Sequence, residues 1–482
     1  MEQAHVFQKR RTGVLLHITS LPSAKLGEDA YRFVDLLAQA GVSVWQMLPL
    51  GPTHSDGSPY QCLSAHAANT KLICIKMLKQ QPWANADEID GLKRSAKMAQ
   101  AYYQFVRQAS HEDKQAFSHF IDSQQYWLED YVLFCEIRLL QQQTAWFQWP
   151  AALRDRNEMA LQKIRSDRED ALNIRRFEQF IFSEQWHALK SYANERGVLL
   201  FGDMPIFVAH DSVDVWANPE LFTLDSEGQP EKVAGVPPDY FSATGQRWGN
   251  PLYRWDEHSK TGFLWWQQRL QTQLDLFDLI RIDHFRGFEA CWEIPAECET
   301  AMDGHWVKAP GDALFRALLT TFGELPLVAE DLGIITEEVT ALREKYGLPG
   351  MKILQFAFGG DASNPYLPHQ HCQDSVAYTG THDNDTTMGW FDTLDDGAKT
   401  HVYEYFGETT EAMPWLLVRA ALQSVSQLAV LPMQDLLALN GEHRMNVPGT
   451  IEGNWTWQFE WDMVDDSCAP KLKKLNKLYG RS

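Results

Sequence analysis

The chain has 482 residues, of which 44% are hydrophobic, and its 43 basic and 64 acidic side chains give a net charge of −21. This charge repels a phosphate backbone, which argues against nucleic acid as a partner, and the length suits a barrel of about 250 residues with large insertions. No apolar run reaches the roughly 18 residues that a membrane span requires, and the seven cysteines include no CxxC pair. We therefore expect reduced thiols in a cytoplasmic protein with no membrane association.

Eight short apolar runs predict buried parallel strands. The first lies in GVLLHIT, which is too short and too polar for a signal peptide. In chain order the expected strands are Val14–Ile18, Val42–Leu48, Val198–Phe201, Leu279–Ile282, Leu325–Ala329, Met351–Phe356, Ser375–Thr379 and Leu428–Pro432. Amphipathic helices lie between several of them, such as the one predicted by Ala30, Phe33, Val34 and Leu37 before Gly41. This alternation predicts an α/β fold, a (β/α)8 TIM barrel.

Two gaps between the predicted strands are far longer than ordinary βα loops. Residues 51–167 are expected to form a mainly helical subdomain inserted between the second and third strands, which leaves 1–50 and 168–482 as the barrel. Within 205–262, the string VAGVPPDYFSATGQRWGNPLYRW combines Gly and Pro, which interrupt regular structure, with several aromatic rings. We expect this second insertion to be a lid-like loop over the mouth of the barrel.

Four carboxylates each come directly after an apolar run. They are Asp203 in LLFGDMPIF, Asp283 in LIRIDHF, Glu330 in LPLVAEDLG and Asp383 in VAYTGTHDN. The C-terminal ends of the strands of a parallel barrel form its active-site rim, and the burial of four acids is costly unless they are paired or used. The sequence therefore predicts a single acidic active site.

The neighbours of these acids suggest their chemistry. Arg281 lies two positions before Asp283, so on a strand both side chains face the same way and the guanidinium can keep a nucleophilic carboxylate ionised. Glu330 is followed by another acid, whose charge would raise its pKa as a general acid requires. His382 precedes Asp383 and offers a donor to a substrate hydroxyl. Arg-x-Asp and His-Asp pairs are also common structural features, but the combination fits a retaining glycosidase mechanism.

The strings RIDHF, AEDLG and GTHDN resemble the three catalytic motifs of the α-amylase clan. With RTGVLLHITSLP, VWQMLPLGP, SPYQ, GDMPIFVAHDSVDVW, GQRWGNPLYRW, KILQFAF and RMNVPGT, the chain resembles glycoside hydrolase family 77, the 4-α-glucanotransferases or amylomaltases. The resemblance implies a transferase that moves α-1,4-glucan segments between maltooligosaccharides, in glycogen or starch metabolism, through a covalent glycosyl-enzyme. It implies that Asp283 is the nucleophile, Glu330 the acid/base and Asp383 the stabiliser of the transition state.

The resemblance also implies contacts with the substrate. Tyr60 of SPYQ would stack on the glucose at the donor side of the cleaved bond, Asp203, Arg281 and His382 would form hydrogen bonds with it, and Phe356 would line the adjacent rim. The lid residues expected to close over the glucan are Asp239, Tyr240, Gln246 and Trp248.

The chain departs from the family pattern around SPYQ. GPTHSDGSPYQ lacks the tyrosine that relatives place before SPYQ, and this absence argues against a second glucan contact outside the active site. Cys62 and His66 also replace the family's Ser and Phe. No phosphate-binding Gly-rich loop occurs and HQHC has no partner ligands, so we expect neither a cofactor nor a metal. Two alternatives stay open: an α-1,4-glucan hydrolase with the same residues, and a non-catalytic glucan-binding protein.

Overall fold

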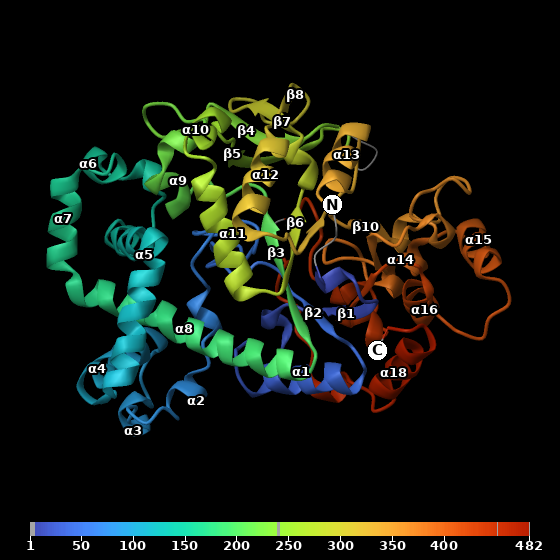
Figure 1. Cartoon of the computed structure of the whole chain (residues 1–482), viewed down its shortest axis with the longest axis horizontal. Helices are drawn as coiled ribbons and strands as arrows, with labels where there is room; N and C mark the ends of the chain where they lie inside the picture. The colour runs from blue at the N-terminus through green and yellow to red at the C-terminus, as the bar shows by residue number, and fades with distance from the viewer. Residues whose placement is uncertain (1–4, 239–241, 451, 482) are drawn as a thin grey trace.

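Eight parallel strands form a closed barrel in the computed structural model, which describes residues 5–238, 242–450 and 452–481. Their order is β10-β11-β12-β1-β2-β3-β6-β9, and the backbone N–H of Ala329 donates to the carbonyl of Pro349 at 2.9 Å, which joins β9 to β10. The strands are β1 Arg11–Leu15, β2 Val44–Gln46, β3 Leu199–Pro205, β6 Leu279–Asp283, β9 Leu327–Ala329, β10 Gly350–Ile353, β11 Ser375–Tyr378 and β12 Leu428–Pro432. The chain is a (β/α)8 barrel, as the eight apolar runs predicted (Figure 1).

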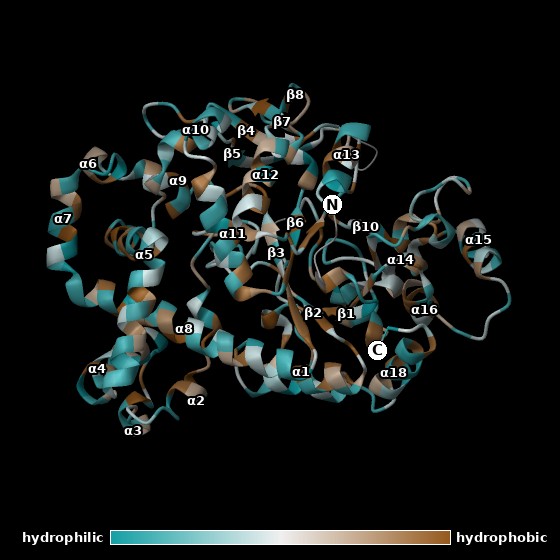
Figure 2. Ribbon diagram, in the orientation of Figure 1, coloured by the Kyte–Doolittle hydropathy of each residue, from teal (hydrophilic) through white to brown (hydrophobic). Residues whose placement is uncertain are grey.

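Alternate residues of each barrel strand face two different cores. On β12, Leu428 and Val430 belong to a cluster to which all eight strands contribute and which fills the barrel interior. Ala429 and Leu431 belong to the larger cluster between the strands and the surrounding helices. Because side chains of a strand alternate between its faces, strands buried on both sides read as the continuous apolar runs seen in the sequence (Figure 2).

The helices around the barrel bury one face each. α1 buries Ala30, Phe33, Val34 and Leu37 and ends before Gly41, whose φ of +67° suits glycine, so this predicted helix is confirmed. The helices outside the segment between β2 and β3 are α1 Glu28–Gln39, α9 Val213–Ala217, α10 Trp255–Lys260, α11 Leu264–Leu276, α12 Gly311–Phe322, α13 Glu337–Lys345, α14 Thr387–Thr393, α15 Asp396–Phe406, α16 Trp415–Gln423, α17 Met433–Leu436 and α18 Cys468–Leu478.

The segment between β2 and β3 is mainly helical, and α2 to α7 lie at one end of the molecule (Figure 1). Its helices are α2 Ile75–Leu78, α3 Ala86–Ile89, α4 Arg94–Gln108, α5 His111–Leu140, α6 Ala151–Arg154, α7 Glu158–Asp167 and α8 Glu169–Glu195. Ser110 and Asp113 form a capping box that starts α5. α8 packs against α5 and also against α1 and β3, so it connects this segment to the barrel. The assignment of 51–167 as a separate subdomain stays a prediction.

A second, antiparallel sheet was not expected from the sequence. Its order is β5-β4-β7-β8, and its strands are β4 Lys232–Val236, β5 Gln246–Pro251, β7 Ala290–Pro295 and β8 His305–Lys308. Two of these strands lie within 205–262, so that segment is not the irregular loop that its Gly and Pro content suggested. The ladder between β4 and β5 is irregular between Val233 and Gly235, which interrupts the period-2 pattern by which strands are recognised.

Several predicted strands have wrong bounds, since β2 covers Val44–Gln46 instead of Val42–Leu48 and β3 covers Leu199–Pro205 instead of Val198–Phe201. β1 covers Arg11–Leu15 instead of Val14–Ile18, and β10 covers Gly350–Ile353 instead of Met351–Phe356. In both cases the following apolar residues form a buried 3-10 turn, Ile18–Ser20 or Leu354–Phe356. An apolar run reports burial and cannot by itself distinguish a strand from a buried turn.

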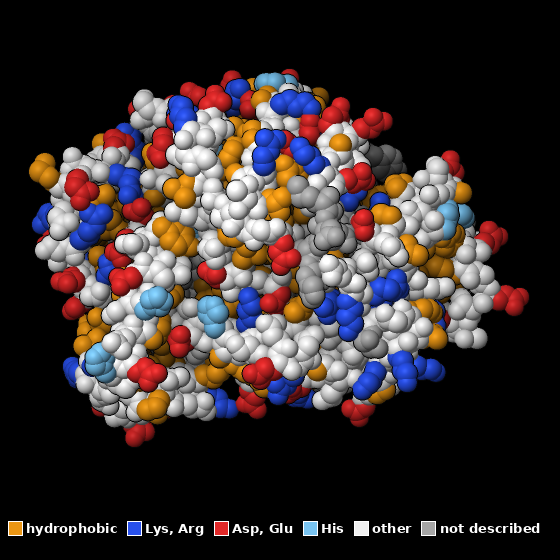
Figure 3. Space-filling view, viewed as in Figure 1, with side chains coloured by type: hydrophobic (Ala, Val, Ile, Leu, Met, Phe, Trp, Pro, Cys, Tyr) orange, Lys and Arg blue, Asp and Glu red, His pale blue; other side chains and the backbone are white. Residues whose placement is uncertain are grey.

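Among the described residues, every helix is too short or too polar to span a bilayer. Acidic and basic side chains are interspersed over the face of the molecule shown in Figure 3.

Candidate active site

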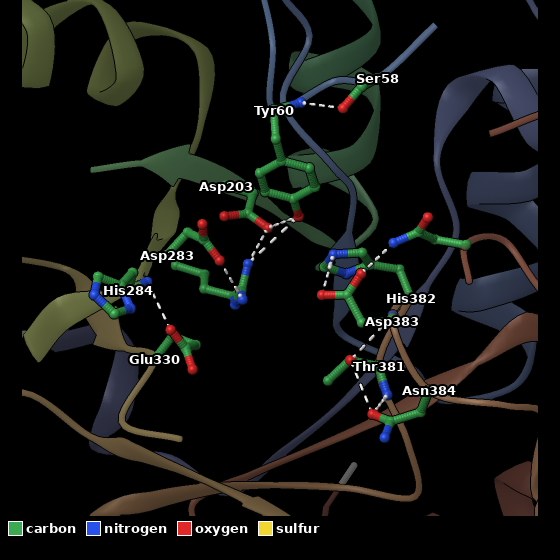
Figure 4. Close-up of polar contacts among 12 residues, drawn as sticks. Ser58, Tyr60, Asp203, Asp283, His284, Glu330, Thr381, His382, Asp383 and Asn384 are labelled. Carbon is green, nitrogen blue, oxygen red and sulfur yellow. Dashed lines mark hydrogen bonds and ion pairs between the residues drawn. The ribbon is translucent and has the colours of Figure 1, made fainter. Parts of the chain in front are cut away.

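A buried arginine joins two carboxylates at the C-terminal end of the barrel (Figure 4). Nη1 of Arg281 donates to Oδ2 of Asp203 at 2.5 Å, and Nη2 donates to Oδ1 of Asp283 at 2.8 Å. Asp203 on β3 pairs in register with Arg281 on β6, and Asp283 follows two residues later, so all three side chains meet on one rim. The hydroxyl of Tyr60 also donates to Asp203, at 2.8 Å. The predicted Arg-x-Asp arrangement is present.

Burial sets the charge states of this group. Asp203 is 1% exposed and Arg281 is 4% exposed. Burial alone would lower the pKa of Arg281, but the charges of Asp203 and Asp283 raise it well above its ordinary value, so the guanidinium stays a cation. Burial raises the pKa of Asp203, and the charge of Arg281 opposes this rise. The cation therefore holds Asp283 in a fixed orientation.

Glu330 follows β9 and meets the end of β6. Its Oε2 accepts the backbone N–H of His284 at 2.6 Å, and its Oε1 accepts the N–H of Leu332 at 3.1 Å. Burial and then the charge of Asp283 raise the pKa of Glu330 to about 8. The carboxyl is therefore protonated at neutral pH, as a general acid requires.

The charge of Asp331 contributes less to the raised pKa of Glu330 than its place next to Glu330 in the sequence suggested. The carboxylate of Asp331 accepts the N–H of Met351 at 2.7 Å and lies 3.3 Å from Nε of Arg343. Its charge is the smallest of the influences on the pKa of Glu330, behind burial, Asp283 and Arg281. Adjacent residues at a strand end point in different directions, so the neighbour in sequence is not the nearest neighbour in space.

Asp383 lies in the loop after β11, and its side chain is 45% exposed. Oδ2 lies 3.2 Å from Nε2 of His382, and Oδ1 accepts the side-chain N–H of Asn446 at 2.6 Å. Desolvation alone would raise the pKa of Asp383, but the charge of His382 and the hydrogen bonds from His382 and Asn446 hold it well below its ordinary value. Asp383 is therefore an ionised carboxylate whose side chain is partly exposed to solvent. The Nη2 group of Arg444 donates to its backbone carbonyl at 3.0 Å.

Aromatic rings line the wall beside Asp383. The rings of Tyr60 and His382 are stacked, with centroids 5.2 Å apart and planes 15° apart. Trp455 contacts both rings. Sequence reasoning identified neither Asn446 nor Trp455 as a residue of the site. The only signal was their position in or near the RMNVPGT motif, because nothing local connects residues more than sixty positions away to Asp383.

Two residues of the predicted lid, Gln246 and Trp248, lie in the part of the chain that the structure describes. Nε1 of Trp248 donates to Oε1 of Gln246 at 3.1 Å, and the ring of Trp248 meets His284 edge to face at a centroid distance of 4.8 Å. Trp248 thus lies against the residue that follows Asp283. Asp239 and Tyr240 lie outside the described residues.

Phe356 lies at the end of the 3-10 turn Leu354–Phe356, directly after β10 and at the same end of the barrel. Its ring packs edge to face against Tyr366 at 5.5 Å.

Cys62 and His66, where the chain departs from the family pattern, lie behind Tyr60. Together with Tyr60 and Asp203 they line one hollow. The thiol of Cys62 donates to the carbonyl of Pro59 at 3.1 Å, and burial lowers the pKa of His66 to about 3. Cys62 therefore supports the Tyr60 loop directly, whereas His66 is a neutral group whose Nδ1 lies 2.8 Å from the hydroxyl of Thr272. Within the described ranges, no three His, Cys, Asp or Glu side chains are grouped so that they could hold a metal ion.

Comparison with known proteins identifies the family of this chain. Residues 16–463 match the glycoside hydrolase family 77 model, described as 4-alpha-glucanotransferase. A 4-alpha-glucanotransferase of Thermus thermophilus is 48% identical over 93% of this chain and 94% of its own length. The chloroplastic/amyloplastic enzyme of Solanum tuberosum is 41% identical over 98% and 87%. A Streptococcus agalactiae amylomaltase, solved in complex with acarbose, superposes with a TM-score of 0.93 at 37% identity and covers 98% of this chain and 100% of that chain. The chain belongs to glycoside hydrolase family 77, the 4-alpha-glucanotransferases.

Proposed function

We propose that the chain is a retaining 4-α-glucanotransferase that transfers α-1,4-glucan segments between maltooligosaccharides through a covalent glycosyl-enzyme. The observation that carries this proposal is the pairing of a carboxylate held by Arg281 with a second carboxyl, Glu330, whose pKa is raised to about 8 on the same rim. A nucleophile that is ionised and an acid that is protonated at the same pH are the two states that retention with a covalent intermediate needs.

The two half-reactions follow from these charge states. Glu330 gives its proton to the glycosidic oxygen while the carboxylate of Asp283 attacks the anomeric carbon, so the glycosidic bond breaks and a glycosyl ester forms. Glu330, now ionised, then removes the proton from the 4-hydroxyl of an acceptor sugar, whose oxygen displaces Asp283. Two inversions give net retention. The carboxylate of Asp383 stabilises the oxocarbenium-like charge and the ring hydroxyls in both steps.

The surrounding residues supply the sugar contacts in this proposal. The ring of Tyr60 packs on the C–H face of the glucose at the donor side, and Asp203, Arg281 and His382 form hydrogen bonds with its hydroxyls. The lid residues Gln246 and Trp248 close over the bound glucan, and Phe356 lines the acceptor rim. The proximity of Trp248 to His284 supports a lid that reaches the reacting bond. All seven cysteines are free thiols, which supports a cytoplasmic place in glycogen or starch metabolism.

Incubation with pure maltotriose tests the transfer. A glucanotransferase produces glucose together with oligosaccharides longer than the substrate, whereas a hydrolase produces only shorter ones. Chromatographic separation of the products distinguishes these outcomes. Unchanged maltotriose would support the glucan-binding alternative instead.

The covalent step has its own test. With α-maltotriosyl fluoride, whose leaving group needs no protonation, Glu330→Gln should form the glycosyl-enzyme and then release it slowly, because the base for the second step is missing. Mass spectrometry should show an added maltotriosyl group on the peptide that carries Asp283. An adduct on another peptide, or no adduct while fluoride is released, would refute the assignment of Asp283.

A further inference from the structure

Trp455 has a backbone conformation that a bulky residue rarely adopts. Its φ is +65°, in the left-handed region, where the Cβ of an L-residue is crowded by the backbone. Its N–H donates to the carbonyl of Met445 at 2.8 Å, and the preceding Asn454 accepts the N–H of Val447 at 2.9 Å. Such a conformation persists only where the surroundings enforce it, and it is concentrated at functional sites. Glycine is the residue that the backbone alone would favour here.

The strained position places the indole against the active site. The ring of Trp455 lies 5.9 Å from that of Tyr60 at 48°, and 6.0 Å from that of His382 at 40°. Since Tyr60 and His382 stack on each other at 5.2 Å, the three rings are in mutual contact. Trp455 also faces the start of the Tyr60 loop, because a Cβ on Gly57 would lie 4.0 Å from the Cβ of Trp455.

We propose that Trp455 is a positioning residue for the glycosyl-transfer site. Its strained backbone holds the indole against Tyr60 and His382, so that both of these rings keep their orientation. This rests on the proposed function, in which those two residues contact the donor-side glucose. The orientation of His382 matters because its Nε2 lies 3.2 Å from Asp383. A displacement of the imidazole by a few tenths of an ångström weakens the contact between His382 and Asp383. The stabilisation of the transition state by Asp383 weakens with it.

The pH dependence of kcat/KM distinguishes the positioning role of Trp455 from a role in packing alone. The charged or titratable groups that face the pair of His382 and Asp383 are Tyr60, His17, Asp203, Arg281 and Arg444. None of them is altered by a substitution at 455. If His382 loses its orientation, its hold on the Asp383 carboxylate weakens and that carboxylate binds a proton at a higher pH. Since Asp383 acts in its ionised form, the acid limb of kcat/KM should move to higher pH.

The test compares Trp455→Gly, Trp455→Ala and Trp455→Phe with a matched control, Trp461→Ala. Trp461 is also half-buried, but its Nε1 donates to Asp29 and its ring contacts Arg32, away from the active site. Trp455→Gly should melt at a temperature at least as high as Trp455→Ala, because glycine tolerates the left-handed backbone. Its kcat/KM on maltotriose should nevertheless fall by roughly tenfold to a hundredfold, mainly in kcat.

Three further readouts complete the experiment. Trp455→Phe, which restores a ring, should recover part of kcat and of the wild-type pH profile, and Trp461→Ala should keep both. Wild-type kcat and an unmoved acid limb in Trp455→Gly would overturn the proposal, as would an equal loss in Trp461→Ala. Acarbose affinity, measured by calorimetry, keeps the proposal testable without turnover, because only the Trp455 variants should bind it more weakly. A wild type that leaves maltotriose unchanged would refute the proposed function, whereas unaltered acarbose binding in Trp455→Gly would refute only the role of Trp455.

Discussion

The backbone N–H of His284 donates to Oε2 of Glu330 at 2.6 Å, so the residue after the proposed nucleophile holds the proposed acid. His284 has a φ of +54°, and this left-handed turn ends β6. The hydrogen bond favours the ionised carboxylate and lowers the pKa of Glu330, while burial and the charge of Asp283 raise it more strongly. The first half-reaction needs protonated Glu330 and the second needs its carboxylate. These opposing influences keep the pKa of Glu330 close enough to neutral pH for both forms to be populated.

The first prediction concerns the alkaline limb of activity. With maltotriose, kcat/KM should fall as pH rises through about 8, because Glu330 must be protonated to release the leaving group. With α-maltotriosyl fluoride, release of fluoride needs no acid, so this limb should disappear from the first step. Initial rates of both substrates between pH 6 and pH 10 check this (a range of about two pH units on either side of that pKa). The same alkaline limb with both substrates would contradict the assignment of Glu330 as the acid.

The second prediction concerns the buried cation. Removing the guanidinium in Arg281→Met leaves Asp203 and Asp283 without their partner, and the uncompensated buried charge should lower the free energy of unfolding by about 3–5 kcal/mol. In Asp203→Asn/Arg281→Met the buried charge is gone, so part of that stability should return. Activity should stay low in both, because Asp283 has lost its orienting donor. Urea unfolding and kcat on maltotriose are the measurements, and a double variant no more stable than the single one would contradict this account.

The third prediction concerns the opposite end of the barrel. Arg481 is fully buried near the C-terminus, and its guanidinium donates to the backbone carbonyls of Arg11, Leu422, Ser424, Ser426 and Gln427. These carbonyls lie where β1 begins and in the segment from the end of α16 to the start of β12. Arg481→Ala should lower the free energy of unfolding by at least about 3 kcal/mol, because several buried acceptors lose their donor together.

The control for this prediction is Lys477→Ala, an exposed position on the last turn of α18, which should change stability little. The catalytic constants of folded Arg481→Ala should stay close to wild type at a temperature well below its melting point, because the substitution is at the end of the barrel away from the site. A stability loss no larger than that of Lys477→Ala would show that the chain end does not hold the barrel together.

The barrel and its acids could be predicted from the sequence because each barrel strand is buried on both faces. A strand of this kind is a continuous apolar run, and carboxylates that follow such runs fall at or near the rim. Asp203, Asp283, Glu330 and Asp383 were found in this way, although Asp203 lies within β3 and Asp383 lies in the loop beyond β11. The second sheet could not be found in this way. The exposed residues of β5 gather at its start instead of alternating, and the irregular β4 to β5 ladder interrupts the alternating pattern.

Local sequence patterns could not predict the supporting residues of the site, for a different reason. Asn446 donates to Asp383 across 63 positions of sequence, and Trp455 reaches Tyr60 across an even longer separation. Neither residue lies in a helix or strand, so no periodicity predicts where its side chain points. Their positions are set by the packing of the C-terminal segment over the barrel end, which only the folded chain reveals.

The last prediction concerns the choice between transfer and hydrolysis. Water competes with the acceptor sugar for the glycosyl-enzyme, so a transferase must exclude it and orient an acceptor hydroxyl. Trp248 covers His284, next to Asp283, and bonds to Gln246 on the same strand, so it is well placed as that barrier. Trp248→Ala should raise the fraction of turnovers that end in hydrolysis more than it slows formation of the glycosyl-enzyme, whereas Trp248→Phe, which keeps a ring, should retain most of the transfer. Reducing-end release measured against disproportionation of maltotriose gives the ratio. If both rates fell together and the ratio stayed constant, Trp248 would only bind substrate, and the barrier to water would lie elsewhere in the lid.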